Sequence, residues 1–219
     1  MLIALDDVLT RHEVAALREA AAGLDFEDGR RTAGRYARDV KHNEQAADTP
    51  RREAVLTKAR QALERHETFR SAARPRRFAR MLVSRYGPGM EFGMHVDDPI
   101  QQGSRTDLSF TLFLSPSDSY EGGGLVMQDA IEERVIKLEA GSAILYPTSA
   151  LHQVEPVTRG ERLAVVGWVT SWVRDPGRRE ILHDLDHAAS AMFDATGKSP
   201  GFDRLHKAKA NLYRMWADD

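Results

Sequence analysis

Apolar positions recur with a helical period near the start of the chain. A short apolar run at residues 2–5 is typical of a strand, and a helix is predicted over about residues 11–22. Thr10 and Glu13 stand three residues apart at its start, which is the pattern of a capping box. The pattern therefore predicts a strand followed by a capped amphipathic helix.

A second helix is predicted after a polar stretch. Residues 25–45 are polar and contain two glycines, so we expect a hairpin or loop there. Thr49 is followed by Pro50, and proline is tolerated at the first helical position because its missing N–H has no intrahelical partner there. Helical spacing continues from this point.

Beyond about residue 77 the period changes from helical to alternating, which indicates strands. Glycine- and proline-rich turns such as residues 87–89 separate the alternating runs. Many short strands divided by such turns favour a double-sheet jelly roll or barrel. The predicted strands are 78–86, 92–97, 107–114, 125–127, 133–138, 143–146 and 163–173.

The helical period returns from Asp175 and is interrupted at residues 197–201. We therefore expect an α+β, mainly β chain with a double-stranded β-helix (jelly-roll) core. Residues 1–174 would form this core with supporting N-terminal helices, and residues 175–219 a C-terminal helical appendage. The appendage either packs on the barrel or provides a homodimer face, since amphipathic helices have a second side to cover.

Composition narrows the class of protein. The chain has 219 residues, 42% of them apolar, and a net charge of −2, so no global basic field favours nucleic acid. The absence of cysteine excludes disulfides and thiolate chemistry. No apolar run is long enough for a membrane span, and we expect a cytoplasmic protein. A local basic run at residues 74–77, with Arg80 and Arg85, is either a solvated face or strand edge, or a contact for an anionic partner.

The candidate chemistry begins with His95 and Asp97. On an extended chain, residues two apart point to the same side. His152 lies 55 residues after Asp97 and just beyond another apolar run. Two histidines and one carboxylate make the facial triad of non-haem Fe(II) oxygenases, although Zn(II), Mn(II) and Ni(II) suit the same ligand types. A competing cluster at residues 183–187 falls on the C-terminal helix, where we interpret it as solvated or capping.

Arg162 distinguishes the triad from a chance arrangement. It opens an alternating run ten residues after His152. An arginine that points into a barrel is a costly buried charge unless it is paired, and a carboxylate is its natural bidentate partner. A dicarboxylate that chelates the metal at one end and meets Arg162 at the other explains the four residues together, and 2-oxoglutarate has that shape.

These residues carry a family resemblance over nearly the whole chain. The sequence resembles the Fe(II)/2-oxoglutarate-dependent dioxygenases and, within them, the bacterial PKHD-type hydroxylases, which are related to the prolyl 4-hydroxylase catalytic domain. The stretches that match are residues 40–45, 85–86, 92–97, 105–114, 120–125, 145–152 and 156–162, with the helical tail from Arg174.

The resemblance implies roles for individual residues. His95, Asp97 and His152 would be the iron ligands, and Arg162 would bind the distal carboxylate of 2-oxoglutarate. Tyr86 would add a hydroxyl hydrogen bond to that carboxylate, or else be a core tyrosine. Asn43 and Gln45 would reach the substrate. Trp168 would line the pocket, or else pack in the core. His42 departs from the family pattern, where we expect asparagine, and leaves the substrate more open.

The implied reaction is hydroxylation of a C–H bond, with Fe(II) as cofactor, 2-oxoglutarate and O2 as cosubstrates, succinate and CO2 as products, and L-ascorbate as reductant. The substrate would be an amino acid, a peptide or another small metabolite. One alternative is a non-catalytic, cupin-like metal-binding jelly roll, which has no need of Arg162. Another is nucleic-acid demethylation, but those relatives carry a second arginine where this chain has Trp168. We therefore expect no nucleic-acid and no membrane partner.

Overall fold

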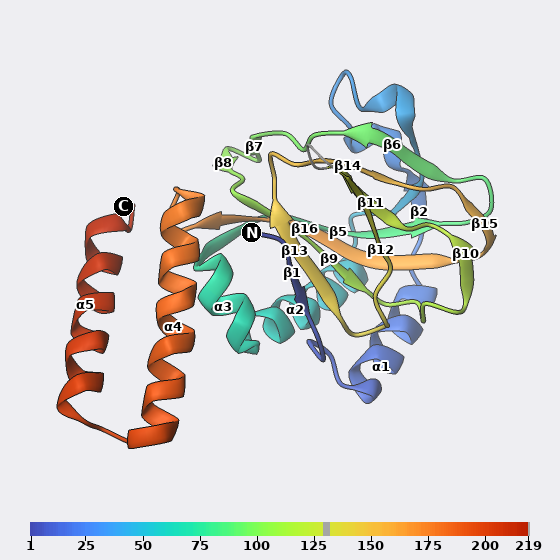
Figure 1. The fold of residues 1–219 in the computed structure, drawn as a ribbon. Helices are drawn as coiled ribbons and strands as arrows, with labels where there is room; N and C mark the ends of the chain where they lie inside the picture. Colours follow the sequence, from blue (N-terminus) through green and yellow to red (C-terminus); the bar gives the residue numbers. More distant parts are fainter. Residues whose placement is uncertain (129–131, 219) are drawn as a thin grey trace.

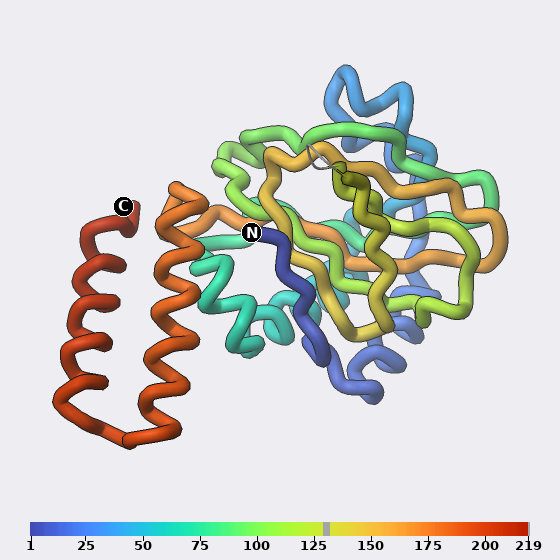
Figure 2. Tube along the Cα trace, in the orientation of Figure 1, coloured from blue at the N-terminus to red at the C-terminus, as the bar shows by residue number. Residues whose placement is uncertain are grey.

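The computed structural model describes residues 1–128 and 132–218. Two antiparallel sheets face each other, three helices cover the outer side of the larger sheet, and a helical hairpin stands to one side (Figure 1). The Cα trace in Figure 2 shows the same division, with the hairpin at the end of the chain apart from the sheets. The predicted double-stranded β-helix with supporting helices is confirmed.

The first helix, α1 (Arg11–Ala22), begins where the sequence predicts. Thr10 accepts a hydrogen bond from the N–H of Glu13, whose carboxylate accepts one from the N–H of Thr10, so the predicted capping box is confirmed. Helix α2 (Pro50–Arg65) starts at the predicted proline. A separate helix α3 (Glu67–Ala73) follows; the sequence reading missed this break, at which Nδ1 of His66 accepts the N–H of Phe69.

The larger sheet has the strand order β1-β13-β9-β16-β5-β4-β2. Its strands are β1 (Ile3–Leu5), β13 (Ala143–Pro147), β9 (Leu108–Phe113), β16 (Arg162–Ser171), β5 (Pro75–Tyr86), β4 (Glu44–Ala46) and β2 (Phe26–Asp28). The long pair β5 and β16 runs through its middle, with Tyr86 opposite Arg162 and Arg80 opposite Trp168. These two strands form the floor of the site described below.

The smaller sheet has the order β12-β11-β14-β6-β3. Its strands are β12 (Glu133–Ile136), β11 (Leu125–Gln128), β14 (Leu151–Val154), β6 (Glu91–His95) and β3 (Lys41–His42). Two further pairs lie at the ends of the barrel: β7 (Ile100–Gln101) with β8 (Ser104–Arg105), and β10 (Tyr120–Gly122) with β15 (Val157–Gly160). The short strands β14, β15, β7 and β8 were not predicted, and β10 was predicted as a turn.

Residues 25–45, predicted as a hairpin or loop, contribute to both sheets. Two short 3₁₀ helices, η1 (Gly29–Thr32) and η2 (Arg38–Val40), lie between strand β2 and strand β3. Strand β3 then pairs with β6 in the smaller sheet, whereas β4 pairs with β5 and β2 in the larger one. The segment 41–46 thus connects the two sheets along one side of the barrel.

Alternation along the strands of the larger sheet produces two separate cores. Residues of one parity, such as Val83 on β5 and Val165 on β16, pack against the helices. Residues of the other parity, such as Tyr86 on β5 and Phe113 on β9, face the smaller sheet. Because a strand points successive side chains to opposite faces, the same strands support the helices and line the interior of the barrel.

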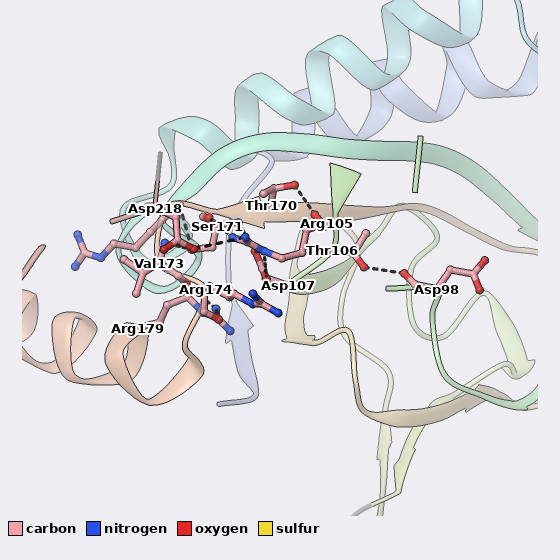
Figure 3. Close-up of polar contacts among 11 residues, drawn as sticks. Asp98, Arg105, Thr106, Asp107, Thr170, Ser171, Val173, Arg174, Arg179 and Asp218 are labelled. Carbon is pink, nitrogen blue, oxygen red and sulfur yellow. Dashed lines mark hydrogen bonds and ion pairs between the residues drawn. The ribbon is translucent and has the colours of Figure 1, made fainter. Parts of the chain in front are cut away.

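The chain ends in helices α4 (Pro176–Thr196) and α5 (Pro200–Trp216), separated near the predicted break. Polar contacts join this hairpin to the barrel (Figure 3): Nη1 of Arg179 donates to the carbonyl of Val173, and Arg105 forms an ion pair with Asp218. The domain division at residue 174 and the homodimer face stay predictions. Among the described helices, none combines the length and apolar character needed to cross a bilayer.

The histidine cluster on α4 differs from our interpretation as solvated or capping residues. His183 is buried, and its Nδ1 lies 2.6 Å from Oγ of Ser71 on α3. Its Nε2 lies 3.2 Å from Nε2 of His187. The cluster therefore helps to join the hairpin to α3.

Candidate functional site

His95, Asp97 and His152 converge between the two sheets. His95 is the last residue of β6, and His152 on β14 is its direct partner across the smaller sheet. Asp97 lies two residues beyond the end of β6, on the loop rather than on the strand that we predicted to extend through it. The smaller sheet therefore sets the two imidazoles side by side, and the loop brings the carboxylate to them.

The three side chains form a compact donor set. Nε2 of His95 lies 3.8 Å from Oδ1 of Asp97, and Nε2 of His152 lies 3.7 Å from Oδ2 of Asp97. One ligand atom from each residue lies within 4.8 Å of the others, and all three side chains are almost fully buried. This is the only such group of metal-ligating side chains found in the described part of the chain.

Backbone carbonyls orient both imidazoles. Nδ1 of His95 lies 2.8 Å from the carbonyl of Gly93, and Nδ1 of His152 lies 3.0 Å from that of Ala150. A carbonyl oxygen can only accept, so each Nδ1 carries the proton and each Nε2 presents its lone pair to the centre of the triad. Burial and the neighbouring His152 lower the pKa of His95 to about 4, which keeps its imidazole neutral, as metal ligation requires.

The loop that carries Asp97 is held from two sides. Oγ of Ser109 on β9 donates to Oδ2 of Asp97 at 2.7 Å. One residue further on, the carbonyl of Asp98 accepts a hydrogen bond of 2.7 Å from Oγ1 of Thr106, as Figure 3 shows. Next to Thr106, the buried side chain of Asp107 accepts the N–H of Ser171 at the end of β16. The carboxylate of the triad is thereby positioned relative to the larger sheet.

Arg162 lies on β16 with only 1% of its surface exposed. Its guanidinium carbon lies 5.3 Å from the ring centroids of both Tyr86 and Phe113. None of its three side-chain nitrogens forms a hydrogen bond with a described residue. A buried, unpaired guanidinium is strongly unfavourable, so this arrangement calls for an anionic ligand.

A glycine makes room for this arginine. Gly123 has φ +64°, in the left-handed region that favours glycine. A Cβ atom there would lie 3.1 Å from Cδ of Arg162 and 3.1 Å from the ring of Tyr120. The glycine-rich turn after β10 therefore allows the arginine to lie under it.

The triad and Arg162 share one cavity between the sheets. Its space, including the open mouth, is about 780 Å³. All eight residues predicted from the sequence line it: His95, Asp97, His152, Arg162, Tyr86, Asn43, Gln45 and Trp168. Burial raises the pKa of Tyr86 and so keeps its phenol protonated. The structure thus brings the predicted residues together, while their individual roles stay predictions.

The sequence leaves Arg80 open as a contact for an anionic partner, and it does not single out Lys41 or Ser109. Lys41 and Arg80 line the cavity, and Ser109 bonds to Asp97. The alternation of side chains along a strand could have indicated Lys41 and Arg80 as cavity residues. Lys41 has the same parity as Asn43 and Gln45, and Arg80 has the same parity as Tyr86 on a strand that was predicted.

Comparisons with known protein sequences support a family assignment for this chain. The sequence profile of the 2OG-Fe(II) oxygenase superfamily matches residues 81–170, which include the triad and Arg162. The chain is 52% identical to a PKHD-type hydroxylase of Maricaulis maris, over the full length of both proteins. It is 45% identical to a PKHD-type hydroxylase of Picosynechococcus, again over the full length of both.

Solved structures are similar in fold. A prolyl-4-hydroxylase of Pseudomonas putida has a TM-score of 0.54 and 21% identity, covering 78% of this chain and 92% of its own. A Trichoplax adhaerens prolyl hydroxylase, in complex with a hypoxia inducible factor peptide, has a TM-score of 0.60 and 14% identity over 78% of this chain and 83% of its own. At such low identity, these similarities show a shared fold.

Proposed function

This chain belongs to the PKHD-type hydroxylases of the 2OG-Fe(II) oxygenase superfamily and is an oxygenase enzyme, and we propose that it hydroxylates a C–H bond of a small molecule or peptide. Fe(II) would be the metal, 2-oxoglutarate and O2 the cosubstrates, and succinate and CO2 the further products. L-ascorbate would serve as reductant. We also propose that the enzyme acts in the cytoplasm, without a nucleic-acid or membrane partner.

The donor set fits Fe(II). His95 and His152 present neutral Nε2 atoms, and Asp97 presents a carboxylate, which together are the two-histidine, one-carboxylate set of non-haem iron oxygenases. We propose these three as the iron ligands. The backbone carbonyls and the Ser109 hydroxyl then act as the outer partners that orient them.

The observation that carries the proposal is the guanidinium of Arg162, which has no hydrogen-bond partner among the described residues and lies in the same cavity as the triad. A metal-binding protein without a cosubstrate has no use for a buried cation beside its metal, which would only repel the ion. A cosubstrate with a second carboxylate would provide the missing partner, and 2-oxoglutarate has one. This favours an oxygenase over the non-catalytic, cupin-like alternative.

The residues of the chain have distinct tasks in this proposal. Arg162 binds the distal carboxylate of 2-oxoglutarate, and Tyr86, directly across the sheet from it, supplies a phenolic hydrogen bond. Apolar side chains, among them Leu82, Val154 and Val166, line the cavity and exclude water around the bound substrate. His95, Asp97 and His152 would hold Fe(II), which would supply the O2 chemistry that couples decarboxylation of 2-oxoglutarate to hydroxylation of the substrate. Asn43, Gln45 and Trp168 would contact that substrate.

The test has two stages on the purified full-length chain. Under anaerobic conditions, 2-oxoglutarate is titrated into the Fe(II)-loaded protein, and binding is followed by the visible charge-transfer absorbance of the iron complex. Air and fractions of a metabolite extract are then added, and succinate release is measured by mass spectrometry. We expect 2-oxoglutarate to bind and some fractions to stimulate succinate release. Metal binding without 2-oxoglutarate binding would instead support the cupin-like alternative.

A further inference from the structure

The cavity contains a second set of donors besides Arg162. Lys41 on β3 and Arg80 on β5 both line it, and Trp168 on β16 adds an indole N–H. Arg80 lies directly opposite Trp168, whereas Tyr86 lies opposite Arg162. Since these two cross-strand pairs are six residues apart on strands that rise about 3.3 Å per residue, they are separated by roughly 20 Å along the sheet.

This separation assigns the two cationic regions to different ligands. The backbone register places Arg80 and Trp168 at the opposite end of the β5–β16 pair from Arg162, where the distal carboxylate of the five-carbon diacid is proposed to bind. Arg80 and Trp168 are therefore free for the primary substrate. From the sequence, the basic run is interpreted either as a solvated face or strand edge or as a contact for an anionic partner. The structure separates its members: Arg77 is exposed, whereas Arg80 faces the cavity.

The donors in this region have few acceptors within the described part of the chain. Lys41 is only 6% exposed, and its Nζ donates to Oγ1 of Thr32 at 3.2 Å. Within residues 1–128 and 132–218, neither Lys41 nor Arg80 forms an ion pair at contact distance, although Asp97 and Asp28 attract Lys41 and Asp98 attracts Arg80. Nε1 of Trp168 is buried and has no hydrogen-bond partner in the described ranges. The exposed carboxylate of Asp98 lines the same cavity but pairs with neither cation.

Such an arrangement is unfavourable without a ligand. Burial and repulsion from Arg80 lower the pKa of Lys41 to about 8, so the ammonium still carries its charge at neutral pH. Buried charges in folded proteins are normally paired. The partner missing from the protein is therefore expected on the ligand.

Lys41 also lies at a useful distance from the triad. Its Nζ is 5.0 Å from the ring centroid of Phe92, and that ring stacks on the imidazole of His95 with centroids 3.6 Å apart. One aromatic ring therefore separates the ammonium from a proposed iron ligand. A small anion held by Lys41 would bring its neighbouring C–H bonds close to the metal.

We propose that the primary substrate bears an oxyanion, either a carboxylate or a phosphate, which Lys41 and Arg80 bind, with the indole N–H of Trp168 as a further donor. The inference rests on the proposed function, because it assumes that Arg162 is occupied by the cosubstrate. It restricts the substrates of the enzyme to acidic metabolites or to peptides with an acidic group at the target residue.

The experiment uses three probes of one shape: benzoate, phenyl phosphate and the neutral benzamide. The full chain is loaded with Ni(II), which accepts the same ligands, and with 2-oxoglutarate. Each probe is then titrated by calorimetry into the wild type, Lys41→Gln and Arg80→Gln. The matched controls are Lys58→Gln on α2 and Arg77→Gln on β5, two exposed residues outside the cavity lining.

We expect at least one anion to bind about tenfold or more tightly than benzamide, and each cavity variant to reduce that affinity about tenfold or more. The control variants should bind the anion with an affinity within about twofold of the wild type, because exposed charges contribute little to binding. The anion that binds more tightly shows whether the oxyanion of the substrate is a carboxylate or a phosphate. Equal binding of benzamide, no binding of any probe, or unchanged affinity in both cavity variants would overturn the inference.

The titration of 2-oxoglutarate into the Ni(II) protein separates the two proposals. If 2-oxoglutarate does not bind, the proposed function itself fails. If it binds and the probes show no preference for an anion, only the inference fails. A loss of 2-oxoglutarate affinity in Lys41→Gln with unchanged probe binding would place Lys41 on the cosubstrate, which also overturns it. If Lys41→Gln does not fold, the preference of the wild type for an anion over benzamide and the affinity of Arg80→Gln, a variant at a half-buried position, still test the inference.

Discussion

Oγ of Ser109 donates a 2.7 Å hydrogen bond to Oδ2 of Asp97, the carboxylate of the proposed iron site. Ser109 belongs to β9 in the larger sheet, and its Oγ also lies 3.2 Å from Oγ1 of Thr148. A strand of the opposite sheet thus fixes the carboxylate on the loop after β6. Asp97 and its partner are 12 residues apart in sequence, and the bond exists only once the two sheets have assembled.

We expect Ser109→Ala to lower Fe(II) affinity about 10- to 100-fold, because outer hydrogen bonds orient metal ligands. Competition with a coloured chelator under anaerobic conditions measures the dissociation constant. Ser119→Ala, an exposed serine bonded only to the carbonyl of Pro116, is the matched control. Equal affinities in Ser109→Ala and the wild type would show that the hydroxyl does not support the site.

Removing the carboxylate itself should have a larger effect. We expect Asp97→Ala to abolish iron-dependent consumption of 2-oxoglutarate, since two imidazoles alone leave the donor set incomplete. Consumption is followed by chromatography of the reaction mixture. His187→Ala, which removes a histidine outside the cavity, should retain activity. Turnover by Asp97→Ala would contradict the ligand assignment.

Arg162→Met should separate cosubstrate binding from metal binding. We expect the dissociation constant for 2-oxoglutarate to rise about 30-fold or more, because truncating one partner of a buried charge pair typically costs 2–5 kcal/mol. Fe(II) affinity should change little. Without ligand, thermal unfolding of the variant should occur at the same or a higher temperature, because the unpaired buried cation is gone. Equal losses of iron and 2-oxoglutarate affinity would mean that Arg162 is structural.

The start of α1 offers a test of stability against pH. The carboxylate of Glu13 accepts hydrogen bonds from Arg65 and from the backbone of Thr10, and these lower its pKa from 4.5 to about 2. The folded state therefore gains stability above pH 4.5, and this gain is lost as the pH falls towards 2. We expect Glu13→Gln to cost about 1 kcal/mol at neutral pH. Urea unfolding should show that this cost vanishes in acid; a constant cost would contradict the linkage.

The ammonium of Lys41 predicts a pH dependence of anion binding. Burial and Arg80 lower its pKa from 10.5 to about 8, while Asp97 and Asp28 act in the opposite direction. Only the protonated amine pairs with an anion. The affinity for benzoate should therefore be full below about pH 8 and fall as the pH rises through 8, rather than near 10.5. Calorimetry across this range, with Lys41→Gln as the variant that should lack the fall, checks the assignment.

Local signals made the helices predictable. The capping box at Thr10 and Glu13 and the proline at position 50 act within one turn of chain, so they operate regardless of tertiary structure. The break before α3 was missed because His66 is not a common capping residue, and its capping role depends on the ring nitrogen that accepts the N–H of Phe69.

The missed strands depend on partners that are distant in sequence. Strand β14 is only four residues long, with Leu151 exposed, and it exists because β6 and β11 lie on either side of it. Strand β3 has two residues and owes its structure to β6. Neither segment is long enough for alternation to be recognised.

The site was predictable as far as chemistry alone determines it. The ligand types of His95, Asp97 and His152 and the charge of Arg162 suggested the site, and the family resemblance strengthened that prediction and implied the remaining residues. Lys41 was missed because its role depends on the position of β3 beside Phe92, which no local pattern reveals.

The segment from Lys41 to Gln45, which crosses from one sheet to the other, has a consequence for how the enzyme can be modified. Its alternate residues Lys41, Asn43 and Gln45 line the cavity, and none of them belongs to the proposed iron site. Three residues of the cavity wall thus lie within five consecutive positions. Exchanging them between relatives, or randomising the three inward positions, should retarget the enzyme while its iron centre is left in place.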